Sequence, residues 1–163
     1  MVVMIFPTCQ PTLKNVSNQA PYLEAIDKKF LLQRDLYIYQ MNVNRTLEIG
    51  PGTDMSQYSI GVPDEVAEKH IGLRTRHLTI KGIARTGQII TIKKIFYKPD
   101  YYFPYAMYYV VLEGHSQFSG QKIDAGEILN SEGNPPKTER WSTPPVFKKD
   151  MALPLASDGL WWR

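Results

Sequence analysis

Three stretches of alternating side chains limit what this chain can fold into more than any other feature. Residues 76–83, 87–96 and 106–113 place apolar, mostly β-branched or aromatic side chains at about every second position. A period of two is typical of strands, because successive side chains of a strand point to opposite faces of a sheet. The pattern predicts a β core over residues 78–130. Its expected buried positions include Ile90, Ile92, Val110 and Leu112.

Strict alternation in residues 87–96 also assigns the faces of this strand. It places Lys94 on the face of Ile90 and Ile92, and Lys93 with Ile95 on the opposite face. Residues 36–43 alternate too and are rich in β formers, which predicts a further strand. Short strands are expected at residues 117–118 and 123–129.

Two helices are expected besides the strands. Leu23, Ile26, Phe30 and Leu31 recur at helical spacing after Pro21, which predicts a helix near residues 21–33. A second, short helix is expected near residues 63–71, where Pro63 and acidic residues begin it and Gly72 can end it.

The order of the segments from residue 78 onward carries a resemblance. A Gly-x-Ile-x-x-Ile stretch from Gly87 is followed by a loop, by Tyr-Val-Val-Leu-x-Gly ending at Gly114, and by Ile-x-Ala-x-x-Ile-Leu ending at Leu129. This order resembles small SH3-like β-barrels of the Tudor and KOW type over residues 78–130. The resemblance implies a last hairpin that ends in a short barrel-closing strand. An OB-like barrel or a plain antiparallel meander fits the same pattern.

The expected fold is therefore mostly β, with a minor α+β character, and takes the form of a small antiparallel barrel or meander. Residues 1–20 are expected to form an irregular N-terminal arm, residues 21–130 the core domain, and residues 131–163 an extended proline-rich arm. Large apolar side chains recur along this last segment, unlike in a typical disordered tail. The expected partner-binding residues of the arm are Trp141, Phe147, Trp161 and Trp162.

The charge of the chain is unevenly distributed. Residues 69–99 contain eight of the 19 Lys and Arg residues and neither Asp nor Glu, so the rest of the chain holds all 16 acids. Such a block favours a polyanionic partner such as nucleic acid. The alternative is that acids from elsewhere in the chain neutralise these side chains in the fold.

A nucleic-acid interface would combine this basic block with an aromatic loop at residues 96–105, where bases can stack on rings while cations meet phosphates. The loop tyrosines can equally fold back over the barrel. The candidate nucleic-acid-binding residues are Arg74, Arg76, Lys81, Arg85, Lys93, Lys94, Lys98, Tyr101 and Tyr102.

The sequence carries no recognisable catalytic motif. His70, His77 and His115 lack metal-ligand spacing, and Cys9 is the single cysteine. We therefore expect neither an enzyme nor a metal or other cofactor. The absence of a recognisable signal peptide and of a membrane-spanning apolar stretch predicts a protein that works inside the cell or within a particle.

These observations favour a non-catalytic structural component of a larger assembly, such as a virion, a tail structure or a ribonucleoprotein. Its partners would be other protein subunits, docked through its arms, in an oligomer or hetero-complex. The alternative is a nucleic-acid-binding module that uses residues 69–99 and the aromatic loop. A second alternative is a small enzyme whose site is assembled only by folding.

Overall fold

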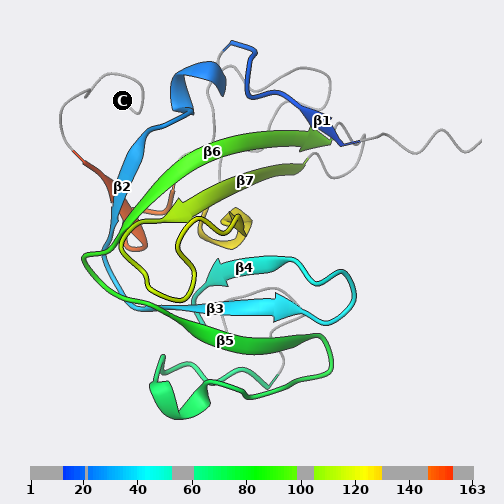
Figure 1. The fold of residues 1–163 in the computed structure, drawn as a ribbon, viewed down its shortest axis with the longest axis vertical. Helices are drawn as coiled ribbons and strands as arrows, with labels where there is room; N and C mark the ends of the chain where they lie inside the picture. Colours follow the sequence, from blue (N-terminus) through cyan, green and yellow to red (C-terminus); the bar gives the residue numbers. More distant parts are fainter. Residues whose placement is uncertain (1–12, 21, 53–60, 99–104, 130–146, 156–163) are drawn as a thin grey trace, which may run out of the picture.

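The computed structural model describes residues 13–20, 22–52, 61–98, 105–129 and 147–155. Strands dominate this part of the chain, and the helices within it are short 3-10 helices (Figure 1). The strands are β1 (Lys14–Asn15), β2 (Lys29–Leu32), β3 (Leu36–Met41), β4 (Leu47–Gly50), β5 (Leu78–Ala84), β6 (Ile89–Lys98), β7 (Tyr105–Leu112), β8 (Ile123–Asp124) and β9 (Ala152–Pro154). The prediction of a mostly β fold is confirmed.

The strands form one sheet in the order β5-β3-β4-β8-β7-β6-β2-β9, and β1 pairs with the far end of β6. The pairs are antiparallel except for β4 and β8, which run parallel. The sheet curls like half of a barrel, with β3, β4 and β5 at one end and β2, β6 and β7 at the other (Figure 1). It encloses the main hydrophobic core.

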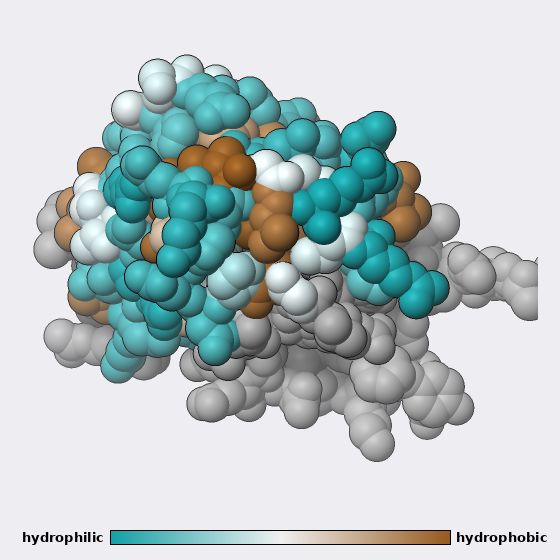
Figure 2. Space-filling model, turned by 90° about the horizontal axis from the view of Figure 1, so that it is seen from below, coloured by the Kyte–Doolittle hydropathy of each residue, from teal (hydrophilic) through white to brown (hydrophobic). Residues whose placement is uncertain are grey.

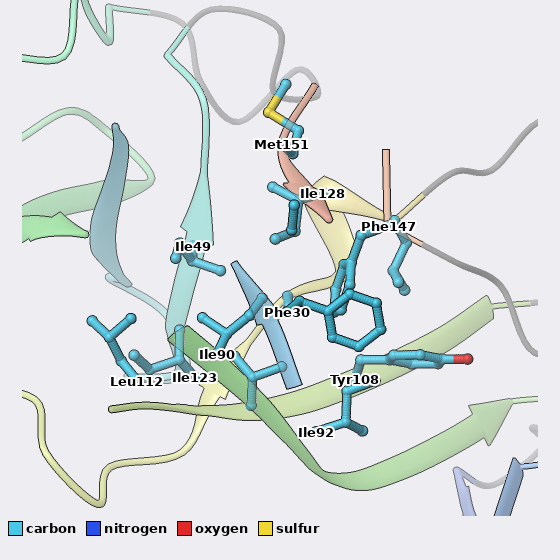
Figure 3. Close-up of a cluster of buried hydrophobic side chains, with 14 of the residues drawn as sticks. Phe30, Ile49, Ile90, Ile92, Tyr108, Leu112, Ile123, Ile128, Phe147 and Met151 are labelled. Atoms are coloured by element: carbon cyan, nitrogen blue, oxygen red, sulfur yellow. The ribbon is translucent and has the colours of Figure 1, made fainter. Parts of the chain in front are cut away.

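The four core positions predicted from alternation, Ile90, Ile92, Val110 and Leu112, are all fully buried. Aromatic side chains complete this core: Phe30 packs edge-on against Phe147, with ring centroids 4.6 Å apart, and Tyr108 packs against the same ring (Figure 3). β-branched side chains on paired strands bury well in this arrangement, which explains why these segments are strands.

A β-bulge in β6 corrects the predicted assignment of faces. Ile92 pairs with Val110 and Lys94 with the next residue of β7, Tyr109, so one additional residue is inserted on β6. The inserted residue shifts the alternation, which leaves both Lys93 and Lys94 exposed and buries Ile95. The core therefore keeps an isoleucine where strict alternation would have placed a lysine.

The prediction of a helix near residues 21–33 is wrong. A 3-10 helix, η1 (Tyr22–Ala25), is followed by Asp27 in the left-handed region, with φ of 63°, and then by strand β2. Phe30 and Leu32 point into the core, and β2 pairs with β6 on one side and β9 on the other. Pairing on both edges outweighs the helical spacing of the apolar residues.

The helix expected near residues 63–71 is only the 3-10 helix η3 (Glu68–His70), followed by Gly72 in the left-handed region. The surrounding segment covers the outer face of β3 and β5, where a second hydrophobic cluster includes Tyr37, Val62 and Ile80. Strand β3 is thus buried on both faces. The strands expected at residues 36–43, 76–83, 87–96 and 106–113 are present with shifted ends as β3, β5, β6 and β7.

Residues 114–122, between β7 and β8, form turns rather than the strand expected at 117–118. Phe118 packs its ring over Gly82 of β5, where a Cβ atom would lie 2.5 Å from a ring carbon. The expected strand at 123–129 is shortened to β8, followed by the 3-10 helix η4 (Gly126–Ile128).

The described part of the C-terminal arm belongs to the domain. Residues 147–155 include strand β9 and bury Phe147, Met151 and Ala152 in the main core. The boundary expected at residue 131 therefore does not separate these residues from the domain. The remainder of that arm, residues 130–146 and 156–163, lies outside the described residues, as does the N-terminal arm up to residue 12.

Candidate functional site

The candidate nucleic-acid-binding residues are divided between two parts of the sheet. Arg74 and Arg76 lie in the exposed segment before β5, and Lys81 lies in β5. The lysines at positions 93, 94 and 98 belong instead to β6, which is separated from β5 by four other strands in the sheet order. The side chain of Lys98 and the loop residues Tyr101 and Tyr102 lie outside the described residues.

Acids from elsewhere in the chain pair with part of the basic block. Lys93 Nζ lies 2.6 Å from Asp27 Oδ1. Arg85 bridges two carboxylates, with Nη1 2.7 Å from Asp35 Oδ2 and Nη2 2.5 Å from Glu68 Oε1. Acidic residues from outside the basic block therefore neutralise two of its side chains, Lys93 and Arg85, which is in part the alternative that the sequence had left open. No ion pair joins Arg74, Arg76, Lys81 or Lys94 to any other described residue.

A row of polar side chains crosses the sheet on the face turned away from the main core. Tyr39 of β3 is the register partner of Glu48 of β4, Glu48 is the partner of Asp124 of β8, and Asp124 is the partner of Tyr109 of β7. Register partners in a sheet share a face, so the four side chains stand side by side. We call these four residues the carboxyl row.

The two carboxyl groups of this row are poorly solvated. Burial, together with the nearby charge of Asp124, raises the pKa of Glu48 to about 7, although a hydrogen bond from Tyr39 Oη at 3.3 Å opposes the shift. Burial raises the pKa of Asp124 to about 6, and a hydrogen bond from the Gly126 amide at 2.9 Å opposes it. The charge of Glu127 raises both pKa values further. The row therefore favours at least one protonated carboxyl near neutral pH.

Neither Glu48 nor Asp124 is among the candidate site residues predicted from the sequence. The two residues are 76 positions apart, and a parallel pairing with a two-residue strand leaves no local signal. Perturbed carboxyl pairs occur at active sites and also in structural networks. Among the described residues, the Tyr39 hydroxyl and the Gly126 backbone amide donate hydrogen bonds to this pair, which position the two carboxyl groups.

His70 and His115 form hydrogen bonds within the fold. Tyr37 Oη donates to the Glu65 carbonyl and lies 2.7 Å from His70 Nδ1, so this nitrogen carries a proton and donates to Tyr37. His115 Nε2 donates to the Ile83 carbonyl at 3.1 Å. Within the described ranges, no group of three His, Cys, Asp or Glu side chains is placed to hold a metal ion.

An apolar strip lies on the outer face at the β9 edge of the sheet. Leu153 of β9 pairs with Leu31 of β2, and Leu31 pairs in turn with Ile89 of β6. Leu155 follows two residues after Leu153. Leu153 is 40% exposed and Leu155 is 39% exposed. We call Leu31, Ile89, Leu153 and Leu155 the outer strip. Figure 2 shows one face of the molecule, on which most of the coloured residues are hydrophilic and hydrophobic residues lie in the middle and at the left and right edges.

The expected partner-binding residues have different outcomes. Phe147 is only 4% exposed and packs between Phe30 and Tyr108, so its assignment as a partner contact is wrong: the domain's own core buries it. Trp141, Trp161 and Trp162 lie outside the described residues.

Among the residues that the structure describes, no helix has the length and apolar character needed to cross a bilayer. No protein-family model matches the chain, and no curated protein or solved structure matches it either.

Proposed function

We propose that this protein is a non-catalytic docking subunit of a larger protein assembly and that the outer strip is one of its contacts. The observation that carries the proposal is the row Leu153–Leu31–Ile89, which continues through Leu155 at an edge of the sheet. Apolar side chains gathered at one exposed place favour burial against another protein surface.

The chemistry of the edge supports side-chain docking rather than the addition of a strand. Pro154 lies within β9 and has no backbone N–H, so the free side of this edge strand lacks a donor that an added strand would need. The partner expected on the outer strip is therefore an apolar protein surface. The residues beyond Leu155 include Leu160, Trp161 and Trp162, which extend the apolar character toward the chain end.

A site-specific photo-cross-linker tests this proposal. Benzoylphenylalanine at position 153 should capture one dominant partner protein in the cells that make this chain. The same group at position 43 should not, because Val43 is 88% exposed in the β3–β4 turn, away from the outer strip. Cross-links from position 153 that lead only to residues 156–163 of the same chain would show an intramolecular strap and overturn the proposal.

Nucleic-acid binding is the second candidate, and one observation favours it. Lys94 is exposed and pairs across the strands with Tyr109, whose ring lies 5.5 Å from that of Phe96 in an edge-on contact. A cation beside two rings suits a single-stranded backbone and its bases. Lys94→Glu should then weaken binding to a single-stranded oligonucleotide and lower its salt dependence, and an absence of binding by the wild type at low salt would remove this candidate.

A further inference from the structure

The two halves of the curled sheet meet along a very short seam. Strands β5, β3 and β4 form one half, and β8, β7, β6, β2 and β9 form the other. The ladder between the halves, β4 with β8, consists of the single residue pair Glu48–Asp124. The backbone pairing between the two halves of the sheet is therefore made by the same two residues that carry the carboxyl groups.

The opposite side of the fold is held far more firmly. The chain itself crosses there twice, from β2 to β3 through residues 33–35 and from β5 to β6 through residues 85–88. The Leu32 amide donates to the Gln88 carbonyl, and the Gly87 amide donates to the Leu32 carbonyl, both at 2.9 Å. Opening of the seam would thus leave this corner intact as a hinge.

We propose that the Glu48–Asp124 pair makes the seam responsive to pH: a proton on the pair keeps β8 and η4 closed on β4, and loss of that proton releases them. The geometry supplies the reason. The carboxyl groups stand on register partners of adjacent strands, and Asp124 is only 6% exposed, so two negative charges at this place would repel each other with little solvent to screen them.

Within the part of the chain that the structure describes, no ion pair brings a cation to Glu48 or Asp124. Tyr39 of β3 donates to Glu48, Tyr109 of β7 is the partner of Asp124, and Glu127 of η4 adds a third carboxyl. Lys94 of β6 comes next in the row beyond Tyr109 and is exposed, and no ion pair joins it to the described carboxylates.

The raised pKa values of Glu48 and Asp124, about 7 and about 6, place the transition in the neutral range. Both groups have raised folded-state pKa values, so the closed seam is favoured at low pH and weakens as the pH rises through these values. Release would free the 123–129 segment, which contributes Ile123, Ala125, Ile128 and Leu129 to the main core. Apolar surface would then become accessible at this edge of β4.

Hydrogen–deuterium exchange at about pH 5.5 and about pH 8, corrected for the intrinsic exchange rate, tests the proposal. Protection of residues 47–50 and 123–129 should fall roughly tenfold or more relative to that of β6 and β7, because a tenfold change accompanies each unit of pKa shift. Glu48→Gln, which keeps an acceptor for Tyr39, should remove most of this fall. Glu113→Gln is the matched control because its carboxylate pairs with Lys29 and Thr91 away from the seam, and it should leave the fall unchanged.

Seam protection that is independent of pH, or a fall that persists in Glu48→Gln, would overturn the proposal. Carbon-13 NMR titration of the wild-type carboxyl groups gives a second measurement that needs no variant. Midpoints for both Glu48 and Asp124 near the ordinary values of about 4 would equally contradict it.

Discussion

Asp35 and Arg85 face each other across the corner where β2 passes into β3 and β5 into β6, with Oδ2 2.7 Å from Nη1. The other oxygen of Asp35 accepts the amide and the hydroxyl of Thr86, at 2.8 and 2.9 Å. These contacts lower the pKa of Asp35; the Thr86 amide has the largest effect, and Arg85 adds to it. One carboxylate thereby joins two chain crossings that lie 50 residues apart in sequence.

Replacement of Asp35 by Ala should lower the free energy of unfolding by about 1 kcal/mol, since the corner is largely solvated. A lowered pKa means that this stabilisation is present above the unfolded value and is lost as the pH falls. The difference between wild type and variant in urea denaturation should therefore shrink below about pH 4. Glu65→Ala, which removes an exposed pair with Lys69, is the control and should change stability by less than about 0.5 kcal/mol. A difference that stays constant down to acid pH would contradict the assigned role.

The carboxyl row has the opposite pH dependence. The raised pKa of Glu48 means that its contribution is present below the unfolded value and is lost as the pH rises to about 7. Glu48→Gln should therefore increase the free energy of unfolding by about 1–2 kcal/mol near pH 8, after allowance for partial exposure, and change it little near pH 5. Glu113→Gln should destabilise at the higher pH, because hydrogen bonds from Thr91 and Lys29 lower the pKa of Glu113. Equal effects of the two substitutions at pH 8 would argue against a buried carboxyl pair.

The Phe118 ring leaves no room for a side chain at position 82 of β5. A Cβ atom at position 82 would lie 2.5 Å from the Phe118 ring, so Gly82→Ala should destabilise by about 1–3 kcal/mol. Phe118→Leu should relieve part of the clash, and the double variant should be more stable than the sum of the single effects predicts. Strict additivity in thermal unfolding would show that the ring does not pack there.

The bulge in β6 buries Ile95 and exposes Lys94, whereas strict alternation would place Lys94 on the core face and Ile95 on the opposite one. Ile95 is fully buried, so Ile95→Ala should cost about 2–4 kcal/mol in chemical denaturation. Lys94 is exposed, and Lys94→Ala should change stability by less than about 0.5 kcal/mol. Similar losses from the two substitutions would place the extra residue elsewhere in the strand.

Local patterns predicted the long strands and the burial of residues such as Ile92 and Val110, because alternation within one segment reports which face is buried. They failed at residues 29–32, where Phe30 and Leu31 continue a helical spacing that begins at Leu23, but pairing with β6 and β9 decides the conformation. The carboxyl row was beyond the reach of the sequence for a related reason. Glu48 and Asp124 become neighbours only through a parallel register between strands that no local pattern specifies.

The outer strip likewise could not be predicted from the sequence, which placed the partner contacts of segment 131–163 at Trp141, Phe147, Trp161 and Trp162. A large apolar side chain in a proline-rich segment does not show which surface it packs against, and Phe147 packs beside Phe30 in the domain's own core. Leu153 and Leu155 belong to the apolar side chains that recur along this segment, but only the pairing of β9 with β2 shows that both leucines face outward.

The most direct test of the docking role compares Leu153→Ser/Leu155→Ser with Val43→Ser in complexes isolated from the cells that make the protein. Light scattering coupled to size-exclusion chromatography should show that the double variant elutes without its partner, while Val43→Ser retains it. The thermal midpoint of the isolated double variant should stay close to that of the wild type, because both leucines are already partly exposed. If the double variant keeps its partner, or unfolds instead of losing it, the outer strip supports the domain itself and the docking role is contradicted.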